Sequence, residues 1–487
     1  MMGFLREVVR EHWIDNEVAI ELDERRGVIH ANLQIGANVT SAKPLRANCE
    51  LSNIGVIPLG SGFILSADEA RSISAGLSPE ISAQLIRAYR NGRDLTDKPR
   101  GVFAIDTYEY AEDELRAEAP KIWQWLRDRV KPERDQNPRR NRRENWWRYG
   151  EDHPRARRAI AGLPRYIATV MTAKHRVFQF LDSSILPDQK LVVIGLDDAY
   201  LLGVLSSIAH VIWATVAGGR LGVGNDPVYG KSACFESFPF PQANHQTVSD
   251  IRELGEHLDA HRKRQQAIHP DLTLTGMYNV LETLRSGKAL TVKERTIHEQ
   301  GLVSVVRQLH DELDAAVLDA YGWSDLLTLL RVSHGNESPP TGQTREDAAR
   351  AFKEAVLERL VALNAERAAE EARGLIRWLR PEFQNRGAQP GPQQTEMDTD
   401  TEADDDNSKS TASSTAAKPK PWPKDPVDQV RAVADLLVSS RTSLTVDDIT
   451  ARFSSRGPWK RRVGPLLEML VALGRATERE GRYIARS

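Results

Sequence analysis

LPRYIATVMTAKHRVFQFLDSSILPDQKLVVIG, residues 163–195, is the stretch that decides the fold. It contains three short apolar or alternating runs, at 165–170, 176–181 and 190–195. Runs of this length that are rich in β-branched and aromatic residues fit a pleated, half-buried surface, and the Pro, Asp and Ser residues between them favour turns. The stretch therefore predicts three strands close together in the chain.

The sequence around this stretch predicts a mixed α/β unit that spans residues 1–242. Residues 199–218 are apolar around most of a helical circumference and predict one buried helix. The unit closes at the Phe-Pro-Phe-Pro tract of residues 238–241. Further strand-like runs occur at 17–22, 27–35, 54–65 and 101–105.

Two local signals predict where helices of this unit begin. Ser66 and Glu69 have the spacing of a capping box, in which each side chain bonds the backbone of the other residue. Pro120 is placed to open the second segment of the helical stretch 111–130, because proline is tolerated in the first turn.

The next part of the chain, residues 243–386, is predicted to be a helical domain. Apolar residues recur there at positions i, i+3, i+4 and i+7, which is the pattern of one buried helix face. Their Leu, Glu and Arg content favours long packed helices rather than an enzyme core. The helical stretches are 248–267, 273–287, 291–323 and 345–380.

Residues 387–423 are predicted to be a disordered acidic linker. Residues 387–421 contain almost no apolar side chains, so burial cannot offset the entropy lost on ordering. They carry seven acidic residues and three lysines.

Residues 424–487 have the order of a winged-helix-like domain. Three helical patterns, at 425–440, 445–455 and 459–474, precede a short hairpin pattern at 475–487. Thr445 is a candidate N-cap that Asp448 can answer.

Composition limits the function classes. The 487 residues suggest about three domains, and the net charge of −2 excludes a uniformly basic, histone-like protein. With two cysteines in all, a disulfide framework and a cysteine zinc site are not expected. The sequence has no run of 18 apolar residues, so we expect a soluble cytoplasmic protein without a membrane partner.

Three short motifs resemble catalytic signatures but favour turns or loops. Gly60-Ser61-Gly62 follows a strand-like run, yet a lone GxG is weak evidence for a cofactor loop. Residues 225–229, NDPVY, resemble the N-P-P-Y pocket of adenine methyltransferases only superficially. Residues 188–190, DQK, have the form of a nuclease metal motif but precede a strand instead of ending one. No P-loop, HExxH, GxSxG or kinase signature occurs in the sequence.

A basic run at residues 139–176 predicts contact with nucleic acid. It holds eleven Lys and Arg residues against three acids, an excess of eight positive charges. Arginine suits phosphate groups and guanine edges, and aromatic residues are interleaved with it. The alternative is a solvated basic face with two core tryptophans. The candidate DNA-binding residues in the first part of this run are Arg139, Arg140, Arg142, Arg143, Trp146, Trp147 and Arg148.

The third helical pattern of the terminal domain carries a second basic group, Lys460, Arg461 and Arg462. A recognition helix meets DNA near its N-terminal end, which is where these residues fall. The alternative is a protein–protein module with a basic surface.

The order and spacing of several motifs resemble the target-recognition region of class I adenine-specific DNA methyltransferases. These are bacterial enzymes of type IIG and IIL restriction-modification and of DISARM- or BREX-like phage defence. The motifs are NGRDL (91–95), PRGVFAID (99–106), WWR (146–148), LPRYIAT (163–169), KHRVF (174–178), LPDQKLVVI (186–194), GRLGVGNDPVY (219–229) and CFESFPFP (234–241). The match is looser at 44–65. The tail resembles the same proteins at 269–281, 297–302 and 320–323, so most of the chain is covered.

The resemblance implies DNA target recognition and names further candidate residues. Lys174, His175 and Arg176 follow a predicted strand and are expected at DNA, as is Arg220 in the GRLGVGNDPVY motif. Asn91, Arg93 and Asp94 are expected either to contact the DNA backbone or to hold a turn.

In this family the S-adenosylmethionine fold lies upstream of the recognition region, and this chain begins almost where that region should begin. The expected partners are therefore double-stranded DNA, a separate catalytic methyltransferase chain, and other defence-system subunits. No cofactor, catalytic residue or metal is expected in this chain, and S-adenosylmethionine is expected on the catalytic partner, which would flip an adenine and methylate it. The alternatives are an intact methyltransferase with an unfamiliar cofactor pocket and a structural scaffold of a defence complex. The predicted fold class is α+β.

Overall fold

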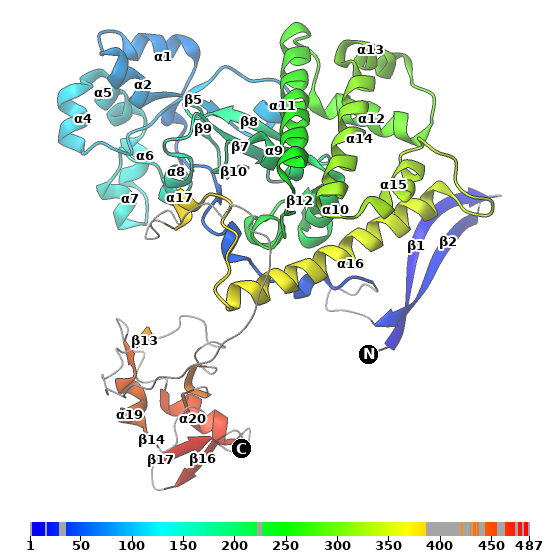
Figure 1. Cartoon of the computed structure of the whole chain (residues 1–487). Helices are drawn as coiled ribbons and strands as arrows, with labels where there is room; N and C mark the ends of the chain where they lie inside the picture. Colours follow the sequence, from blue (N-terminus) through cyan, green and yellow to red (C-terminus); the bar gives the residue numbers. More distant parts are fainter. Residues whose placement is uncertain are drawn as a thin grey trace, which may run out of the picture. The chain divides into compact units, whose positions relative to one another are not determined.

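The computed structural model shows two compact units, Met1–Gly391 and Pro392–Ser487 (Figure 1). Each is described by itself. The structure describes residues 2–14, 17–28, 36–221, 226–385, 420–421, 429, 432–434, 436–437, 444–454, 463–472, 476–479 and 482–485. Apart from residues 420–421, the linker predicted at 387–423 lies outside these residues.

The three strands predicted from residues 163–195 form three neighbouring strands of a four-stranded sheet. Its order is β3-β10-β7-β8, and its neighbouring strands run antiparallel. The side chains of β10 are buried throughout, because helices cover the sheet. The strands are β3 (Ser52–Ile54), β7 (Arg165–Val170), β8 (Phe178–Asp182) and β10 (Leu191–Ile194).

A second sheet has the order β4-β6-β5-β9, and only its β5–β9 pair is parallel. Its strands are β4 (Ile64–Leu65), β5 (Ile86–Arg90), β6 (Phe103–Ile105) and β9 (Leu186–Pro187). The single strand expected at 54–65 is wrong, because Gly60 at φ +155° and the turn η3 (Ser61–Phe63) separate β3 from β4.

Short helices lie around this second sheet, and several of them share its apolar core. Ser66 and Glu69 form the expected capping box on α1, and Pro120 opens α5 as expected. The helices of this region are α1 (Ala67–Ser74), α2 (Pro79–Leu85), α3 (Gly92–Thr96), α4 (Glu112–Glu118), α5 (Pro120–Arg129), α6 (Lys131–Asp135), α7 (Arg140–Glu144) and α8 (Pro154–Ile160). Short 3-10 turns precede them at η1 (Val39–Ser41) and η2 (Arg46–Asn48).

The helix expected at 199–218 is two helices, α9 (Ala199–Ser206) and α10 (Ile208–Ala217), bent by 62°. Ser207 is extended, and the buried Asp314 accepts a hydrogen bond from the Ile208 amide at 2.6 Å. The capped N-terminus of α10 explains the break. Among the described helices, none alone is long and apolar enough to cross a membrane, and α9 and α10 pass that test only as a bent pair.

The helical prediction for residues 243–386 is confirmed, with two differences. The helix expected at 291–323 breaks at Leu302, whose φ of +42° is left-handed. The helix expected at 345–380 ends at Ala372. The helices are α11 (His245–Ile268), α12 (Leu274–Ser286), α13 (Val292–Gly301), α14 (Val303–Ala320), α15 (Leu327–Ser333), α16 (Arg345–Ala372) and α17 (Pro381–Gln384), with the 3-10 turn η5 (Ser324–Leu326) before α15.

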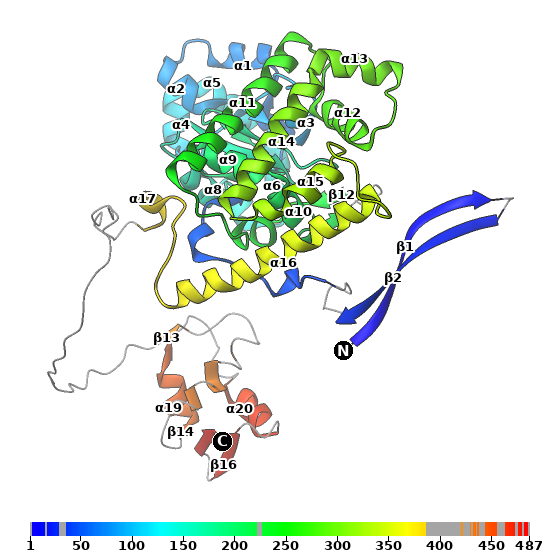
Figure 2. The ribbon, with the colours of Figure 1, turned by 45° about the vertical axis from the view of Figure 1, so that its right-hand side comes forward.

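These helices pack beside α9 and α10, and α16 runs along the group (Figure 2). One apolar cluster contains Trp213 and Phe238 as well as Ile251, Leu313 and Phe352. The core thus joins residues on both sides of the predicted boundary at 242, and that boundary stays a prediction.

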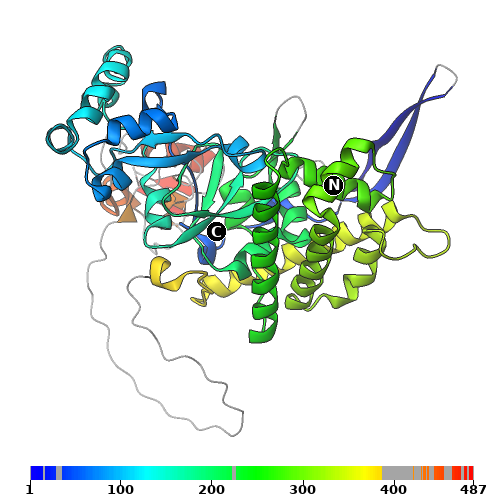
Figure 3. The same cartoon turned by 90° about the horizontal axis from the view of Figure 1, so that it is seen from above.

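Two antiparallel ribbons complete the first unit. β1 (Met2–Ile14) pairs with β2 (Glu17–Val28), which contains the strand expected at 17–22; most of the strand expected at 27–35 lies outside the described residues. β11 (Gly219–Leu221) pairs with β12 (Asp226–Val228) near the edge of the body (Figure 3). The loop expected at 225–229 is therefore largely a strand. The π-helical turn η4 (Lys231–Glu236) follows.

In the second unit, the predicted capping box of Thr445 and Asp448 is present on α19. The short strand before α19 pairs with the last strand of the terminal hairpin, giving the order β14-β17-β16. Val433, Leu437, Ile449 and Leu467 share one core. The elements are β13 (Lys420–Pro421), β14 (Leu444–Thr445), α19 (Val446–Ala451), β15 (Phe453–Ser454), α20 (Val463–Ala472), β16 (Ala476–Arg479) and β17 (Arg482–Ala485).

Candidate nucleic-acid interface

The first arginines of the basic run lie on and beside the short helix α7. Arg140 is 81% exposed and pairs with Glu144 at 2.7 Å. Arg139 and Arg142 both approach Glu151, at 3.7 and 3.3 Å. Exposed ion pairs of this kind are weak, so Arg139 and Arg140 can exchange a carboxylate for a phosphate at small cost, whereas the Arg142 side chain is only 17% exposed.

Arg143 and Arg148 make mostly local contacts. Arg143 donates hydrogen bonds to the carbonyl oxygens of Asn137 and Pro138, at 2.7 and 3.1 Å. Arg148 donates to the Tyr108 carbonyl oxygen and lies over the Tyr108 ring. Arg143 is exposed and Arg148 half-buried, so Arg143 is the more accessible to a phosphate.

The two tryptophans of this run pack in or against the core, while their assignment as DNA contacts stays a prediction. Trp146 is 3% exposed and packs edge-on against Trp123 and Trp147. Trp147 is half-buried and donates its indole N–H to the Tyr110 carbonyl oxygen at 3.1 Å. Their burial favours the core alternative stated for them, most clearly for Trp146.

Acids from outside the run neutralise several of its other cations. Arg157 makes a two-bond contact with the buried Asp106, at 2.7 and 2.9 Å. Arg165 pairs with Glu256 on α11. The excess of eight charges in the sequence therefore overstates the positive charge on the surface.

The next three candidates, Lys174, His175 and Arg176, are engaged within the protein. Lys174 Nζ lies 2.8 Å from Asn279 Oδ1 and 2.9 Å from Glu282 Oε2, and His175 Nε2 lies 2.8 Å from the same Asn279 oxygen. Both partners belong to α12. Lys174 is 54% exposed in this ion pair, and the expectation that a strand end presents all three residues to DNA stays a prediction.

Arg176 is the anchor of the β11–β12 ribbon. Its guanidinium donates to Thr169 Oγ1 at 3.2 Å, to the Val170 carbonyl oxygen, and to the Pro227 carbonyl oxygen at 3.1 Å. It also lies over the ring of Tyr229. Burial lowers the pKa of Arg176, which marks a cation held inside the protein and not one offered to solvent.

The ribbon itself is the most exposed of the candidate elements. All three residues of β11 are exposed, including Arg220, and Leu221 is 62% exposed. Further backbone bonds fix the base of the ribbon: the Tyr229 amide donates to the Met171 carbonyl oxygen at 2.7 Å, and Thr172 bridges Val228. Exposed side chains thus sit on a backbone that is firmly held.

The motifs that resemble catalytic signatures are structural. Gly62 allows close packing on α5, because an added Cβ would lie 2.8 Å from Val130 Cγ2. Tyr229 is 1% exposed among Phe178 and His210 and cannot line an open pocket. Asp188 accepts from the Lys190 amide at 2.8 Å, so the turn interpretation of residues 188–190 is confirmed.

The NGRDL motif holds a turn. The Asn91 side chain accepts from the Arg93 and Asp94 amides, while Asp94 accepts from the Asn91 amide at 2.8 Å. Asp94 is buried and pairs with Arg100. These bonds favour the structural role of Asn91 and Asp94 over a DNA contact.

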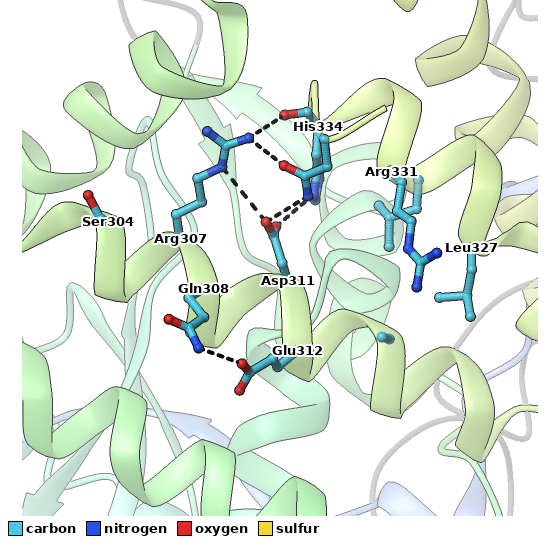
Figure 4. Close-up of a pocket in the computed structure, with 11 residues that line it drawn as sticks. Ser304, Arg307, Gln308, Asp311, Glu312, Leu327, Arg331 and His334 are labelled. Carbon is cyan, nitrogen blue, oxygen red and sulfur yellow. Dashed lines mark hydrogen bonds and ion pairs between the residues drawn. The ribbon is translucent and has the colours of Figure 1, made fainter. Parts of the chain in front are cut away.

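A pocket of about 410 Å³ between α14 and α15 is lined by a polar cluster around Asp311 (Figure 4). Although burial raises the pKa of Asp311, hydrogen bonds from His334 and Asn336 and the charge of Arg285 hold it well below its usual range. The bonds from His334 and Asn336 tie α14 to the end of α15, and the bond from Arg285 ties α14 to α12. Among the described residues, no group of three or more His, Cys, Asp or Glu side chains could hold a metal ion.

Buried polar residues that join the sheet to the helices were not predicted from the sequence. Arg262 of α11 is 2% exposed and donates to the Phe178 carbonyl oxygen at 2.7 Å and to the Tyr278 hydroxyl at 2.9 Å. The same hydroxyl lies 2.8 Å from His310 Nε2. The signal in the sequence was the position of Arg262, which lies on the same face of α11 as the buried Ile251 and Leu258.

Comparisons with known proteins agree with this architecture. A family model described as the MmeI target recognition domain matches residues 39–242. The structure of the type IIL restriction-modification enzyme MmeI in complex with DNA is similar, with a TM-score of 0.51 and 15% sequence identity. The similarity covers 75% of this chain and 42% of the MmeI chain, and no curated protein matches.

At this level of identity the MmeI structure supports the fold, while the family model supports the domain type. The matched residues include both sheets, α9, α10 and the β11–β12 ribbon. Over residues 39–242 the chain is therefore similar to the target recognition domain of MmeI-type restriction-modification enzymes, as the resemblance in its sequence implied.

Proposed function

We propose that this chain recognises a target sequence in double-stranded DNA on behalf of a restriction-modification enzyme of the MmeI type. The observation that carries the proposal is the β11–β12 ribbon, which lies inside the matched residues 39–242 and exposes Arg220 and Leu221. The solved relative is in complex with DNA.

The ribbon has the shape and side chains that groove recognition needs. The major groove of B-DNA admits a two-stranded ribbon. Arginine can bond O6 and N7 of one guanine together, and an apolar side chain can contact the methyl group of thymine. Arg220 and Leu221 supply these two chemistries on adjacent positions.

The exposed cations beside α7 are suited to a different task. Arg139, Arg140 and Arg143 can neutralise phosphates, which gives affinity and position without sequence information. Their present partners are surface carboxylates or backbone carbonyls, and a phosphate competes well with both.

The finer assignments rest on the resemblance. The catalytic step would be methylation of adenine by an S-adenosylmethionine-dependent domain on another chain, in the cytoplasm, with phage defence as the biological setting. Gly62 and Tyr229 make packing contacts in the two motifs that resemble cofactor sites, which agrees with a cofactor held elsewhere.

The second unit supports a winged-helix-like module as part of the proposal. Its strand before α19 pairs with the last strand of the terminal hairpin, as the fold requires. Lys460, Arg461 and Arg462, the cations expected at its recognition helix, lie outside the described residues.

A binding titration on the full chain tests the proposal. Arg220→Ala should weaken binding to a preferred duplex about 10- to 100-fold while changing binding to random duplex little. Lys293→Ala, which removes one exposed charge from α13, is the matched control. If the Arg220→Ala variant keeps both the affinity and the sequence preference of the parent chain, base reading by Arg220 of the ribbon is contradicted. Absence of salt-dependent binding in the parent chain would favour the scaffold alternative.

A further inference from the structure

We propose that helix α12 is a positioning element for the DNA-reading ribbon, acting through Asn279 and Glu282. The inference rests on the proposed function and deepens it. Neither residue is placed at the DNA; both are argued to act on the segment between β7 and β8, residues 171–177, called here the connector.

The connector is held from the α12 side by three polar contacts. Asn279 Oδ1 is shared by Lys174 Nζ and His175 Nε2, both at 2.8 Å, and Glu282 Oε2 takes the second bond of Lys174 at 2.9 Å. The His175 ring also lies 5.9 Å from the ring of Tyr278, the residue before Asn279. Residues from a single turn of α12 therefore bind the side chains of two consecutive connector residues, Lys174 and His175.

The connector in turn holds the ribbon from its other side. Arg176, next to His175, bonds the Pro227 carbonyl oxygen of β12. The Ala173 amide donates to the same oxygen, and the Tyr229 amide donates to Met171. The path from α12 to β12 therefore consists only of side-chain contacts to the connector, single peptide units within the connector, and hydrogen bonds from the connector to β12.

The α12 end of this chain of contacts is itself rigid. Tyr278 is buried, and its hydroxyl meets both Arg262 and His310. Arg262 continues to the Phe178 carbonyl oxygen at the start of β8, so the sheet and α12 are tied together beneath the connector. Burial lowers the pKa of His310 well below its usual value, which favours a neutral ring in this contact.

Base reading requires side chains within a few tenths of an ångström of their productive place. A ribbon held at its base by the connector keeps that accuracy only while the connector is fixed. Removal of the α12 contacts should therefore reduce sequence selectivity, whereas phosphate contacts made elsewhere should persist. This pattern separates a positioning role from a DNA contact.

The test uses the full chain with Asn279→Ala and Glu282→Gln, separately and together. Glu282 is exposed and Asn279 half-buried, so both variants should fold. Glu299→Gln, on an exposed position of α13, is the matched control. The measured quantities are the affinity ratio between the duplex selected by the parent chain and a scrambled duplex, and the dependence of binding on salt.

We expect the double variant to lose about tenfold in the affinity ratio, with an unchanged salt slope. An unchanged ratio would overturn the proposal, and so would a larger salt slope, since that result would show that Lys174, once released from Glu282, neutralises a phosphate. A parent chain without any sequence preference would instead refute the proposed function.

Hydrogen–deuterium exchange without DNA gives a second readout that does not depend on recognition. The amides of Ala173 and Tyr229 are bonded across the connector and β12. They should exchange faster in the double variant than in the parent or in Glu299→Gln. Equal protection in all three proteins would show that α12 does not hold the ribbon.

Discussion

The Arg176 guanidinium lies 3.1 Å from the Pro227 carbonyl oxygen and joins the β7–β8 connector to strand β12. The two residues are 51 positions apart in the sequence. Their hydrogen bond assigns Arg176 to the framework of the recognition domain, while Arg220, seven residues before Pro227, is exposed on the partner strand.

Replacing Arg176 with lysine tests this framework role. A lysine keeps the charge but cannot reach Thr169, Val170 and Pro227 together, since it lacks the planar fork of a guanidinium. We expect a loss of about 2–4 kcal/mol in the free energy of unfolding, measured in urea. A midpoint equal to that of the parent would show that the bonds of Arg176 are dispensable.

Alanine at Arg139, Arg140, Arg142 and Arg143 tests the phosphate contacts. Removing one arginine–phosphate pair should reduce the slope of log affinity against log salt by about 0.9. We expect the slope to fall by less than four times this amount, because the Arg142 side chain is largely buried against Glu151 and cannot reach a phosphate as easily. If the slope measured in a binding titration stays the same, this surface faces away from DNA.

Trp146→Ala separates a core tryptophan from a DNA-stacking one. The cavity left among Trp123 and Trp147 should cost about 3–5 kcal/mol of stability. Well below the melting temperature, the folded variant should bind random duplex with the parent's affinity. Weaker DNA binding by the fully folded variant would mean that Trp146 contacts the nucleic acid.

The buried Asp314 should make stability depend on pH. Burial raises its pKa from 3.8 to about 6. Below about pH 4 the carboxyl is protonated in both the folded and the unfolded state, and it has no effect on stability. As pH rises from about 4 to 6, Asp314 ionises first in the unfolded state, so the free energy of unfolding falls. The loss is complete above about pH 6. Asp314→Asn keeps an acceptor for the Ile208 amide and removes the ionisation.

The variant should therefore gain stability relative to the parent between pH 4 and 6, reaching roughly 1–3 kcal/mol at neutral pH. Urea unfolding of both proteins at several pH values measures the difference. A difference that is constant with pH would show that Asp314 does not titrate in this range.

Local patterns in the sequence predicted much of the fold. The strand at 165–170 and the caps at Ser66 and Thr445 are where the pattern placed them, because period and capping depend on neighbouring residues. The breaks at Ser207 and Leu302 were missed. The first depends on Asp314, more than a hundred residues away, and the second on a left-handed leucine that propensity disfavours.

The contacts of the candidate DNA-binding residues within the protein could not be predicted, for the same physical reason. Lys174 and His175 look like DNA ligands until Asn279 and Glu282 are seen beside them, and one sequence does not reveal a pair 104 to 108 residues apart. Composition also cannot tell a buried Trp146 from an exposed one. Arg220 came from the resemblance, and the structure adds that its strand is exposed.

Selection of bound duplexes from a random library by the full chain, at physiological salt, is the most direct measurement of target recognition. The enriched duplexes should share one short motif, and the Arg220→Ala variant should lose the preference at one or more positions of that motif. Bound duplexes with no shared motif, recovered by parent and variant alike, would contradict sequence recognition by this chain.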